Sequence, residues 1–281
     1  MHKLPLSIRK ALLPVLYPVR NLLHPRAFQT YAVGFPRTGT HSLAHIFAHS
    51  YRSLHEPQSD WVNDLIYAYE IESLSEATIA EMLAQRDRSL WLEMESSHMI
   101  TPFVPILARL FPDARFVVLM RDAYTWLHST LNIHLPLAKP EGLPNRRLRK
   151  TWIARYGYER VPHQVGDAVL KARGLPPVTG YLMHWQDMYT RAFTQLPPER
   201  RLTVYTREIS ASLEKLADFL GVKAKTLETE QTHIDPKSEK STLFYEIDRD
   251  YLEEQVQLHC GALMAQHFPT IRSMEDAFRR G

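Results

Sequence analysis

The segment YAVGFPRTGTHSL, residues 31–43, constrains the fold more than any other part of the chain. An apolar run leads into a short turn that contains Pro36 and Gly39, and residues with helical spacing follow. This order predicts a strand over Tyr31–Gly34, a loop over 35–40 and a helix over Thr40–His49. A loop between a strand and a helix start presents unpaired N–H groups and the positive end of the helix dipole. The segment therefore predicts an anion site of the phosphate-binding kind.

The side chains of this loop suit a phosphate-like anion. Gly39 permits close approach of the backbone, and Arg37 supplies a fixed positive charge. Hydroxyl donors are available from Thr38, Thr40 and Ser42. The loop lacks the Lys–Ser/Thr pair that holds a triphosphate and magnesium, which argues against hydrolysis of ATP or GTP. Taken alone, the loop also fits a plain strand–helix turn capped by Thr40.

A second segment, FVVLMRDAYTWLHST, predicts another anion site. Its apolar strand ends at Arg121, and Ser129 follows eight residues later on the next expected helix, Tyr124–Leu131. Arg121 can bind an anion at the helix start while Ser129 reaches it from two turns on; the alternative is a surface ion pair of Arg121. Together with the first loop, this pattern indicates a ligand with two separate phosphate groups, such as a nucleotide with 5′ and 3′ phosphates.

The rest of the chain alternates strand and helix patterns. We expect a short strand near Tyr51–Leu54, a polar helical region over Trp61–Arg86 and an apolar run over Leu90–Met94. Further expected elements are a helix over Pro102–Leu110, strands at 114–122 and 201–209, and helices at 181–196 and 210–222. The abundant Pro, Gly and Arg of Asn132–Pro177 predict irregular, exposed structure. The order predicts an α/β fold with a central parallel sheet flanked by helices and a ligand at the carboxyl ends of its strands.

Three segments resemble the sulfotransferases. GFPRTGTHSL is similar to their 5′-phosphosulfate loop, usually Pro-Lys-Ser-Gly-Thr-Thr followed by a small residue and Leu. RDAYTWLHS resembles their 3′-phosphate motif, and RLTVYTREISASLEKLADFLGV resembles their Tyr-Glu-Asp-Leu block with its following helix. The resemblance implies a P-loop-like sulfotransferase domain. It also implies in-line transfer of a sulfuryl group from 3′-phosphoadenosine-5′-phosphosulfate to a hydroxyl or amine, without a metal.

The resemblance also assigns roles to individual residues. The 5′ site would comprise Arg37, Thr38, Gly39, Thr40, His41 and Ser42, and the 3′ site Arg121 and Ser129. Arg37 replaces the usual Lys and would neutralise charge on the leaving phosphate oxygen, whereas His41 replaces a Thr. Lys237 and Lys240 fall where the family often closes a basic loop over the nucleotide, although a solvated turn explains them equally well. YTREI departs from Tyr-Glu-Asp-Leu, so the role of that acidic pair is not carried over.

Two residues are candidates for the catalytic base. Glu56, in SLHEPQSDW, resembles the Glu-Pro segment of Golgi-type carbohydrate sulfotransferases. His98, in WLEMESSHMITP, falls where cytosolic small-molecule sulfotransferases place a catalytic histidine. We rank Glu56 first, with the other residue orienting the acceptor, and His55 and Glu95 as weaker candidates. Each also has a structural alternative, as a helix cap, an ion-pair partner or a rim histidine.

Composition limits the partners. The net charge of +3 is too small to argue for nucleic-acid binding. Cys260 is the only cysteine, which excludes an internal disulfide and a Cys-based zinc site. We expect no metal and a cytoplasmic location. Residues 1–28 form a basic, apolar arm interrupted by prolines; we expect it to pack on a single domain, 29–281, and the alternative is a peripheral membrane contact.

The acceptor is left open by the sequence. A carbohydrate, a lipid, a phenol and an amine are all compatible with it, and so is any oligomeric state. Residues 132–177 are expected to be a variable region that forms an acceptor site or a lid. Trp61, Tyr67 and Trp91 either line an acceptor cleft or pack in the core. Two other functions are a P-loop kinase-like phosphotransferase and an inactive protein that binds nucleotides or a membrane surface.

Overall fold

The computed structural model describes residues 19, 21–138, 146–157, 161–228 and 241–279. Lys237, Lys240 and most of the arm at 1–28 lie outside these ranges. Within them, no helix combines the length and apolar character that a membrane span requires.

Five parallel strands form the centre of the fold. They are β1 (Thr30–Val33), β2 (Ser53–His55), β3 (Met94–Ser96), β4 (Arg115–Met120) and β5 (Arg201–Tyr205). Their order is β2-β3-β1-β4-β5, which confirms the predicted parallel α/β sheet. Ala32 of β1 lies opposite Ser96 on one side and Val117 on the other. Because the chain passes from β3 across β1 to β4, the order of the strands reverses around β1, where such sheets bind ligands.

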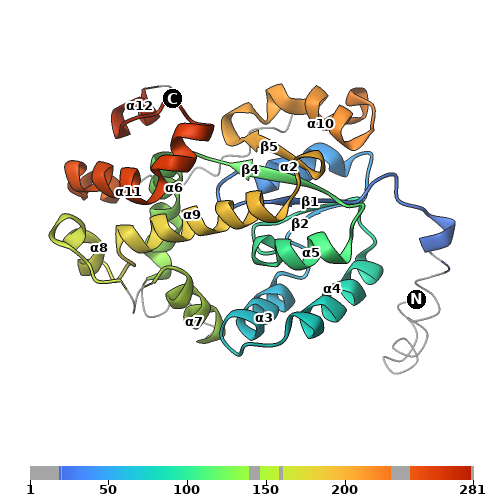
Figure 1. Ribbon diagram of the computed structural model, residues 1–281, viewed down its shortest axis with the longest axis horizontal. Helices are drawn as coiled ribbons and strands as arrows, with labels where there is room; N and C mark the ends of the chain where they lie inside the picture. The colour runs from blue at the N-terminus through green and yellow to red at the C-terminus, as the bar shows by residue number, and fades with distance from the viewer. Residues whose placement is uncertain (1–18, 20, 139–145, 158–160, 229–240, 280–281) are drawn as a thin grey trace.

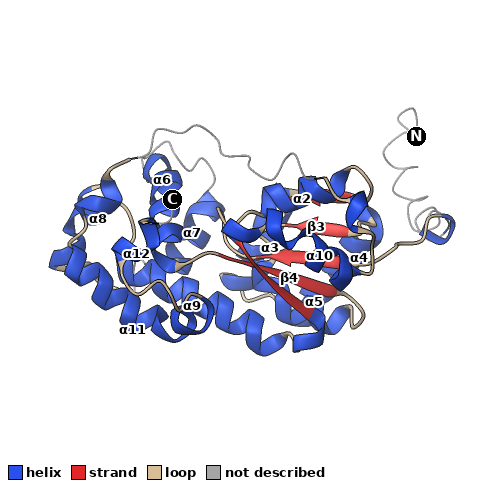
Figure 2. Ribbon diagram, turned by 90° about the horizontal axis from the view of Figure 1, so that it is seen from above, coloured by secondary structure: helices blue, strands red, loops and turns tan. Residues whose placement is uncertain are grey.

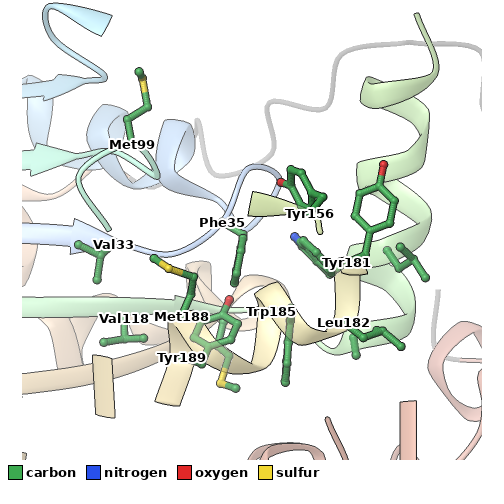
Figure 3. Close-up of a cluster of buried hydrophobic side chains, with 14 of the residues drawn as sticks. Val33, Phe35, Met99, Val118, Tyr156, Tyr181, Leu182, Trp185, Met188 and Tyr189 are labelled. Atoms are coloured by element: carbon green, nitrogen blue, oxygen red, sulfur yellow. The ribbon is translucent and has the colours of Figure 1, made fainter. Parts of the chain in front are cut away.

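Helices cover both faces of this sheet (Figure 1). One face is covered by α2 (Thr40–Ala48) and α10 (Leu213–Leu220), and the other by α3 (Ser59–Glu70), α4 (Glu76–Leu90), α5 (Val104–Leu110) and α9 (Val178–Gln195). Successive strand residues point to opposite faces. Accordingly, Val117 and Leu119 pack in one buried cluster, whereas Val118 packs in the other, which includes Phe35, Trp185, Met188 and Tyr189 (Figure 3).

The remaining helices gather beyond the carboxyl ends of the strands (Figure 2). They are α6 (Ala123–Leu137), α7 (Arg146–Arg155), α8 (Ala168–Ala172), α11 (Arg249–His267) and α12 (Met274–Phe278). Asp122 begins α6 directly after β4, since its carboxylate accepts a hydrogen bond from the Thr125 N–H (2.8 Å). Of these helices, α6 carries Ser129, one of the predicted site residues.

The expectation of irregular, exposed structure over 132–177 is wrong for much of that stretch. Helix α6 continues to Leu137, α7 and α8 are regular, and Leu170 and Leu175 are fully buried. Trp152 of α7 and Tyr156, which follows the end of that helix, pack against the His134 ring at 5.5 and 5.0 Å between centroids. Arg147 and Arg155 on the same helix pair with acidic residues of α3, so the arginines that suggested a solvated loop attach α7 to the domain.

The end of the N-terminal arm that the structure describes is attached to α4, at the amino-terminal edge of the sheet. Arg26 pairs with Asp87 (2.7 Å) and lies 4.1 Å from the centre of the Trp91 ring. Trp91 also donates its indole N–H to the carbonyl of His24 (2.8 Å). Trp91 therefore anchors the arm, which explains this residue without an acceptor cleft. Leu90 ends α4, and the strand of the expected apolar run begins only at Met94.

Candidate active site

The loop between β1 and α2 is tightly confined. Gly39 has a φ of 102°, and a Cβ there would lie 2.3 Å from Cδ1 of Ile209. A Cβ on Gly34 would lie 2.6 Å from the carbonyl oxygen of Leu119. Arg37 is also left-handed, with a φ of 70°. Strained non-glycine residues persist where the surrounding structure forces them, and such places are often binding sites.

The start of α2 is suited to an anion. Its N-cap residue is Gly39, not Thr40, and no side chain caps the helix. The first N–H groups of the helix therefore face the loop without a capping carboxylate or hydroxyl among the described residues. The Thr38 hydroxyl is buried and donates to the carbonyl of Phe35 (2.7 Å), so it shapes the loop. The Thr40 hydroxyl lies 3.2 Å from Nε2 of His55, and Ser42 is buried in the first turn of α2, while His41 is exposed on the same turn, 3.2 Å from His45.

Both predicted phosphate motifs meet at Arg37. Its Nε donates to the Ser129 hydroxyl (2.9 Å), and its carbonyl accepts a hydrogen bond from Nη1 of Arg121 (3.1 Å). Residues 92 and 84 positions apart in the chain are thus in direct contact. The structure brings the two motifs into one positively charged site at the carboxyl ends of β1 and β4.

Sequence reasoning missed the residues that hold Arg121. The Thr125 hydroxyl accepts a hydrogen bond from Nε of Arg121 (3.0 Å) and donates to the carboxylate of Asp122. Thr206 links the loop to the end of β4, because its hydroxyl lies 2.9 Å from the Thr38 carbonyl and 3.2 Å from that of Met120. The sequence signal for the Thr125 contact was Asp122 at an N-cap position three residues before Thr125. No comparable local pattern marks Thr206.

Glu56 and His98 form a hydrogen-bonded pair. Glu56 follows β2 and His98 follows β3, and Nδ1 of His98 contacts Oε1 of Glu56. The backbone of Glu56 is left-handed (φ 46°), and its N–H donates to the carbonyl of Ser96 (3.2 Å). Both side chains are about three-quarters buried, at 27% exposed for His98 and 23% for Glu56. The two candidate bases therefore belong to one unit.

The surroundings of Glu56 keep its carboxylate ionised. Burial by itself raises the pKa of Glu56, but the hydrogen bond and charge of His98, with smaller effects of His55 and His41, outweigh burial and hold that pKa below its usual value. Nε2 of His55 lies 3.4 Å from Oε1 of Glu56. Burial lowers the pKa of His55. His55 therefore lies between Glu56 and Thr40 and contacts both side chains.

Glu95 has a structural partner that explains it. Arg86 of α4 forms a two-pronged ion pair with Glu95 (2.6 and 2.8 Å). The same guanidinium donates to the carbonyl of Pro57 (2.7 Å), next to Glu56. Burial raises the pKa of Glu95, and Arg86 opposes that increase. The pair holds the turn that carries Glu56 in place.

A cavity of about 230 Å³ adjoins the Glu56–His98 pair. The loop lines it through Gly34, Phe35 and Pro36, and His98 lines it from the end of β3; Glu56 is not among its lining residues. Helices α3, α6, α7 and α9 form the other walls. Trp61 and Tyr67 are also absent from the lining: Trp61 packs beside Arg86, and Tyr67 beneath Arg147 of α7.

Across the described ranges, no group of three or more His, Cys, Asp or Glu side chains has the geometry of a metal site. The histidines near Glu56 are instead engaged with one another and with Thr40. His41 and His55 pack edge to face with ring centroids 5.0 Å apart.

The family model for the sulfotransferase domain matches residues 30–231. The chain belongs to the sulfotransferase domain family. The matched range contains the loop, Glu56, His98, Arg121 and Ser129, whereas α11 and α12 follow it.

Two solved structures that share low sequence identity with this chain are also described as sulfotransferase domains. A sulfotransferase domain from the curacin biosynthetic pathway is 12% identical, with a TM-score of 0.36 over 79% of this chain and 83% of that chain. A sulfotransferase domain from the olefin synthase of Synechococcus PCC 7002 is 11% identical, with a TM-score of 0.37 over 79% of this chain and 94% of that chain. No curated protein matches this sulfotransferase-family chain.

Proposed function

We propose that this protein transfers a sulfuryl group from 3′-phosphoadenosine-5′-phosphosulfate to an acceptor hydroxyl or amine. The observation that carries the proposal is the shared cavity: Phe35 and Pro36, at the start of the loop between β1 and α2, line the same space as His98. A donor bound on the loop and an acceptor in the cavity would therefore meet at His98. Such positioning is the main requirement of an in-line transfer.

The donor is assigned to the charged side of this site. The N–H groups at the start of α2 and the Arg37 guanidinium suit the 5′-phosphosulfate, since charge builds on the bridging oxygen as the nucleotide leaves. Arg121 and Ser129 suit the 3′-phosphate, which explains why two anion-binding motifs converge. On this proposal the Ser129 hydroxyl, which binds Arg37 in the structure, turns to the phosphate when the donor binds.

The base is assigned to His98, with Glu56 as its orienting partner, which reverses the ranking made from the sequence. The Glu56 carboxylate accepts a hydrogen bond only from a protonated Nδ1, so in the neutral ring the proton lies on Nδ1 and Nε2 is unprotonated. Nε2 takes the acceptor proton while the acceptor oxygen or nitrogen bonds to sulfur. As this bond forms, the bond from sulfur to the 5′-phosphate oxygen breaks, and Arg37 neutralises the charge that develops on that oxygen. Glu56 stabilises the imidazolium formed.

The other two functions make different predictions for nucleotides. We expect 3′,5′-adenosine bisphosphate to raise the melting temperature clearly more than ATP with magnesium, because the loop lacks the Lys–Ser/Thr pair. A ligand at a hundredfold excess over its dissociation constant stabilises the native state by about 2.7 kcal/mol. Differential scanning fluorimetry measures this. Equal shifts from both nucleotides would refute the donor assignment, and bisphosphate binding without transfer to any acceptor would favour the inactive binding protein.

The 3′-phosphate assignment is tested by Arg121→Ala and Ser129→Ala. Both changes should weaken binding of 3′,5′-adenosine bisphosphate, Arg121→Ala the more, because a hydrogen bond to a charged group contributes about 1.5–3 kcal/mol. Binding of adenosine 5′-phosphosulfate, which has no 3′-phosphate, should change much less. Arg109→Ala, at an exposed position on α5, is the matched control. Equal losses for both nucleotides in calorimetric titrations would place the 3′-phosphate elsewhere.

A further inference from the structure

The walls of the cavity beside His98 are mainly apolar. Side chains from the loop, β3–α5 and helices α3, α6, α7 and α9 supply this surface, among them Phe35, Ile66, Met99, Leu137, Trp152 and Met188. Phe35, Met188 and Tyr156 lie close together in Figure 3. An apolar surface favours a ligand whose body is hydrocarbon, because burial removes apolar area of both partners from water.

The polar side chains of the cavity are held neutral or already paired. Burial, with a smaller effect of His98, lowers the pKa of His134 to about 3, and its Nδ1 lies 2.9 Å from the Tyr181 hydroxyl and 3.3 Å from Nε1 of Trp152. Burial also holds the pKa of His184 well below its usual value. Both rings are therefore uncharged at neutral pH.

Only one of the described lining residues, Arg155, carries a permanent charge. Both carboxylate oxygens of Glu70 bind its guanidinium, each at 2.9 Å. The ion pair is largely shielded, with side chains 17% and 24% exposed. An acceptor with a free carboxylate would compete with Glu70 for this arginine, and an ammonium would lie beside a like charge.

We infer that the acceptor is a small, uncharged molecule with one hydroxyl and a largely hydrocarbon body, which occupies this cavity with its hydroxyl at His98. The inference rests on the proposed function and narrows its acceptor. A sugar would bring several hydroxyls against mainly apolar walls, where few of them would find partners. A charged acceptor would lose its hydration with no free counter-charge among the described lining residues.

The size of the cavity limits the body of the acceptor. A dry apolar cavity of about 150 Å³ binds benzene, and this cavity is about 230 Å³. A bicyclic aromatic ring or a chain of comparable carbon number therefore fits. A phenol and an aliphatic alcohol share this chemistry, and a matched pair of ligands separates them.

Calorimetric titration of the full chain, saturated with 3′,5′-adenosine bisphosphate, tests the inference without turnover. The probes are 2-naphthol, decanol, glucose, 4-hydroxyphenylacetate and tyramine. We expect 2-naphthol or decanol to bind at least about tenfold more tightly than the sugar and the two charged phenols. The better of the first two identifies an aromatic or an aliphatic acceptor. Glucose, 4-hydroxyphenylacetate or tyramine binding as tightly as both neutral probes would overturn the inference.

Substitutions of Leu137, which lines the cavity, test whether the neutral probe binds there. Leu137→Trp fills part of the cavity and Leu137→Asp adds a carboxylate to its wall, so each should weaken binding of the neutral probe by about tenfold or more and leave the bisphosphate affinity unchanged. Leu258→Trp, at a position 69% exposed on α11, is the matched control. Equal affinity in Leu137→Trp, Leu137→Asp and Leu258→Trp would overturn the inference.

Transfer assays with 3′-phosphoadenosine-5′-phosphosulfate and the same probes separate the two proposals. Sulfonation of glucose, detected by mass spectrometry, would refute the apolar acceptor and retain the sulfuryl transfer. Binding of 2-naphthol or decanol with no bisphosphate binding and no sulfonated product would refute the transfer and retain the apolar ligand.

Discussion

His98→Ala is expected to lower kcat by about 10²–10⁴-fold, the usual contribution of a general base, and to leave bisphosphate affinity unchanged. The reason is that His98 lines the cavity proposed for the acceptor, whereas the proposed donor contacts are those of the loop, Arg121 and Ser129. Steady-state kinetics with a responsive acceptor and calorimetric titration of the bisphosphate measure the two quantities.

Glu56→Gln separates the roles of the pair. The amide keeps the shape and can still accept the Nδ1 hydrogen, but it no longer stabilises a positively charged imidazole. We expect a fall in kcat no larger than that of His98→Ala, and a double variant no worse than His98→Ala alone, because residues that act as a unit are not additive. Loss of turnover in Glu56→Gln with near-normal turnover in His98→Ala would make Glu56 the base.

The pair also predicts how stability depends on pH. The pKa of Glu56 is lower in the folded chain than its ordinary value, so its contribution to stability is present above that ordinary value and is lost as the pH falls through the folded pKa. Glu56→Gln should therefore reduce the loss of stability on acidification, which urea titrations at several pH values measure. An unchanged acid dependence would show that Glu56 is not held ionised by its neighbours.

Arg86→Met is expected to destabilise the fold by about 3–5 kcal/mol, because it leaves the Glu95 carboxylate buried without its partner. The two side chains are only 4% and 5% exposed. Arg109→Met, which breaks an ion pair between side chains that are 58% and 56% exposed, is the matched control and should cost about 0–1 kcal/mol. Urea unfolding followed by circular dichroism measures both, and similar small losses would contradict a buried pair.

The double variant Arg86→Met, Glu95→Leu tests whether the pair also positions Glu56. It removes both charges, so much of the lost stability should return. It does not restore the hydrogen bond to the Pro57 carbonyl. We therefore expect kcat to stay reduced, with bisphosphate affinity retained. Full turnover in a stable double variant would show that this contact does not hold the Glu56 turn.

Much of the fold could be predicted from local patterns. Apolar runs alternating with helical spacing are typical of parallel α/β sheets, and this pattern located β1, β2, β4 and β5 near their positions in the structure. The apolar run expected at 90–94 meets β3 only at Met94. The loop after β1 was predictable because its glycines and its place between strand and helix are encoded in neighbouring residues. Helix α7 was missed because its Arg residues and the neighbouring prolines suggested a solvated loop, and helix α11, which buries Leu252, Val256 and Met264, was not predicted.

The Glu56–His98 pair and the cavity depend on contacts that no local pattern encodes. Glu56 and His98 are 42 positions apart and meet because β2 and β3 pair in parallel, which places the residues that follow them side by side. The sequence alone therefore determined the α/β class of the domain, and it predicted an anion site and two candidate bases. The tertiary structure decided which candidate faces the cavity, and it did so because strand register and helix packing, not sequence spacing, set the distances between side chains.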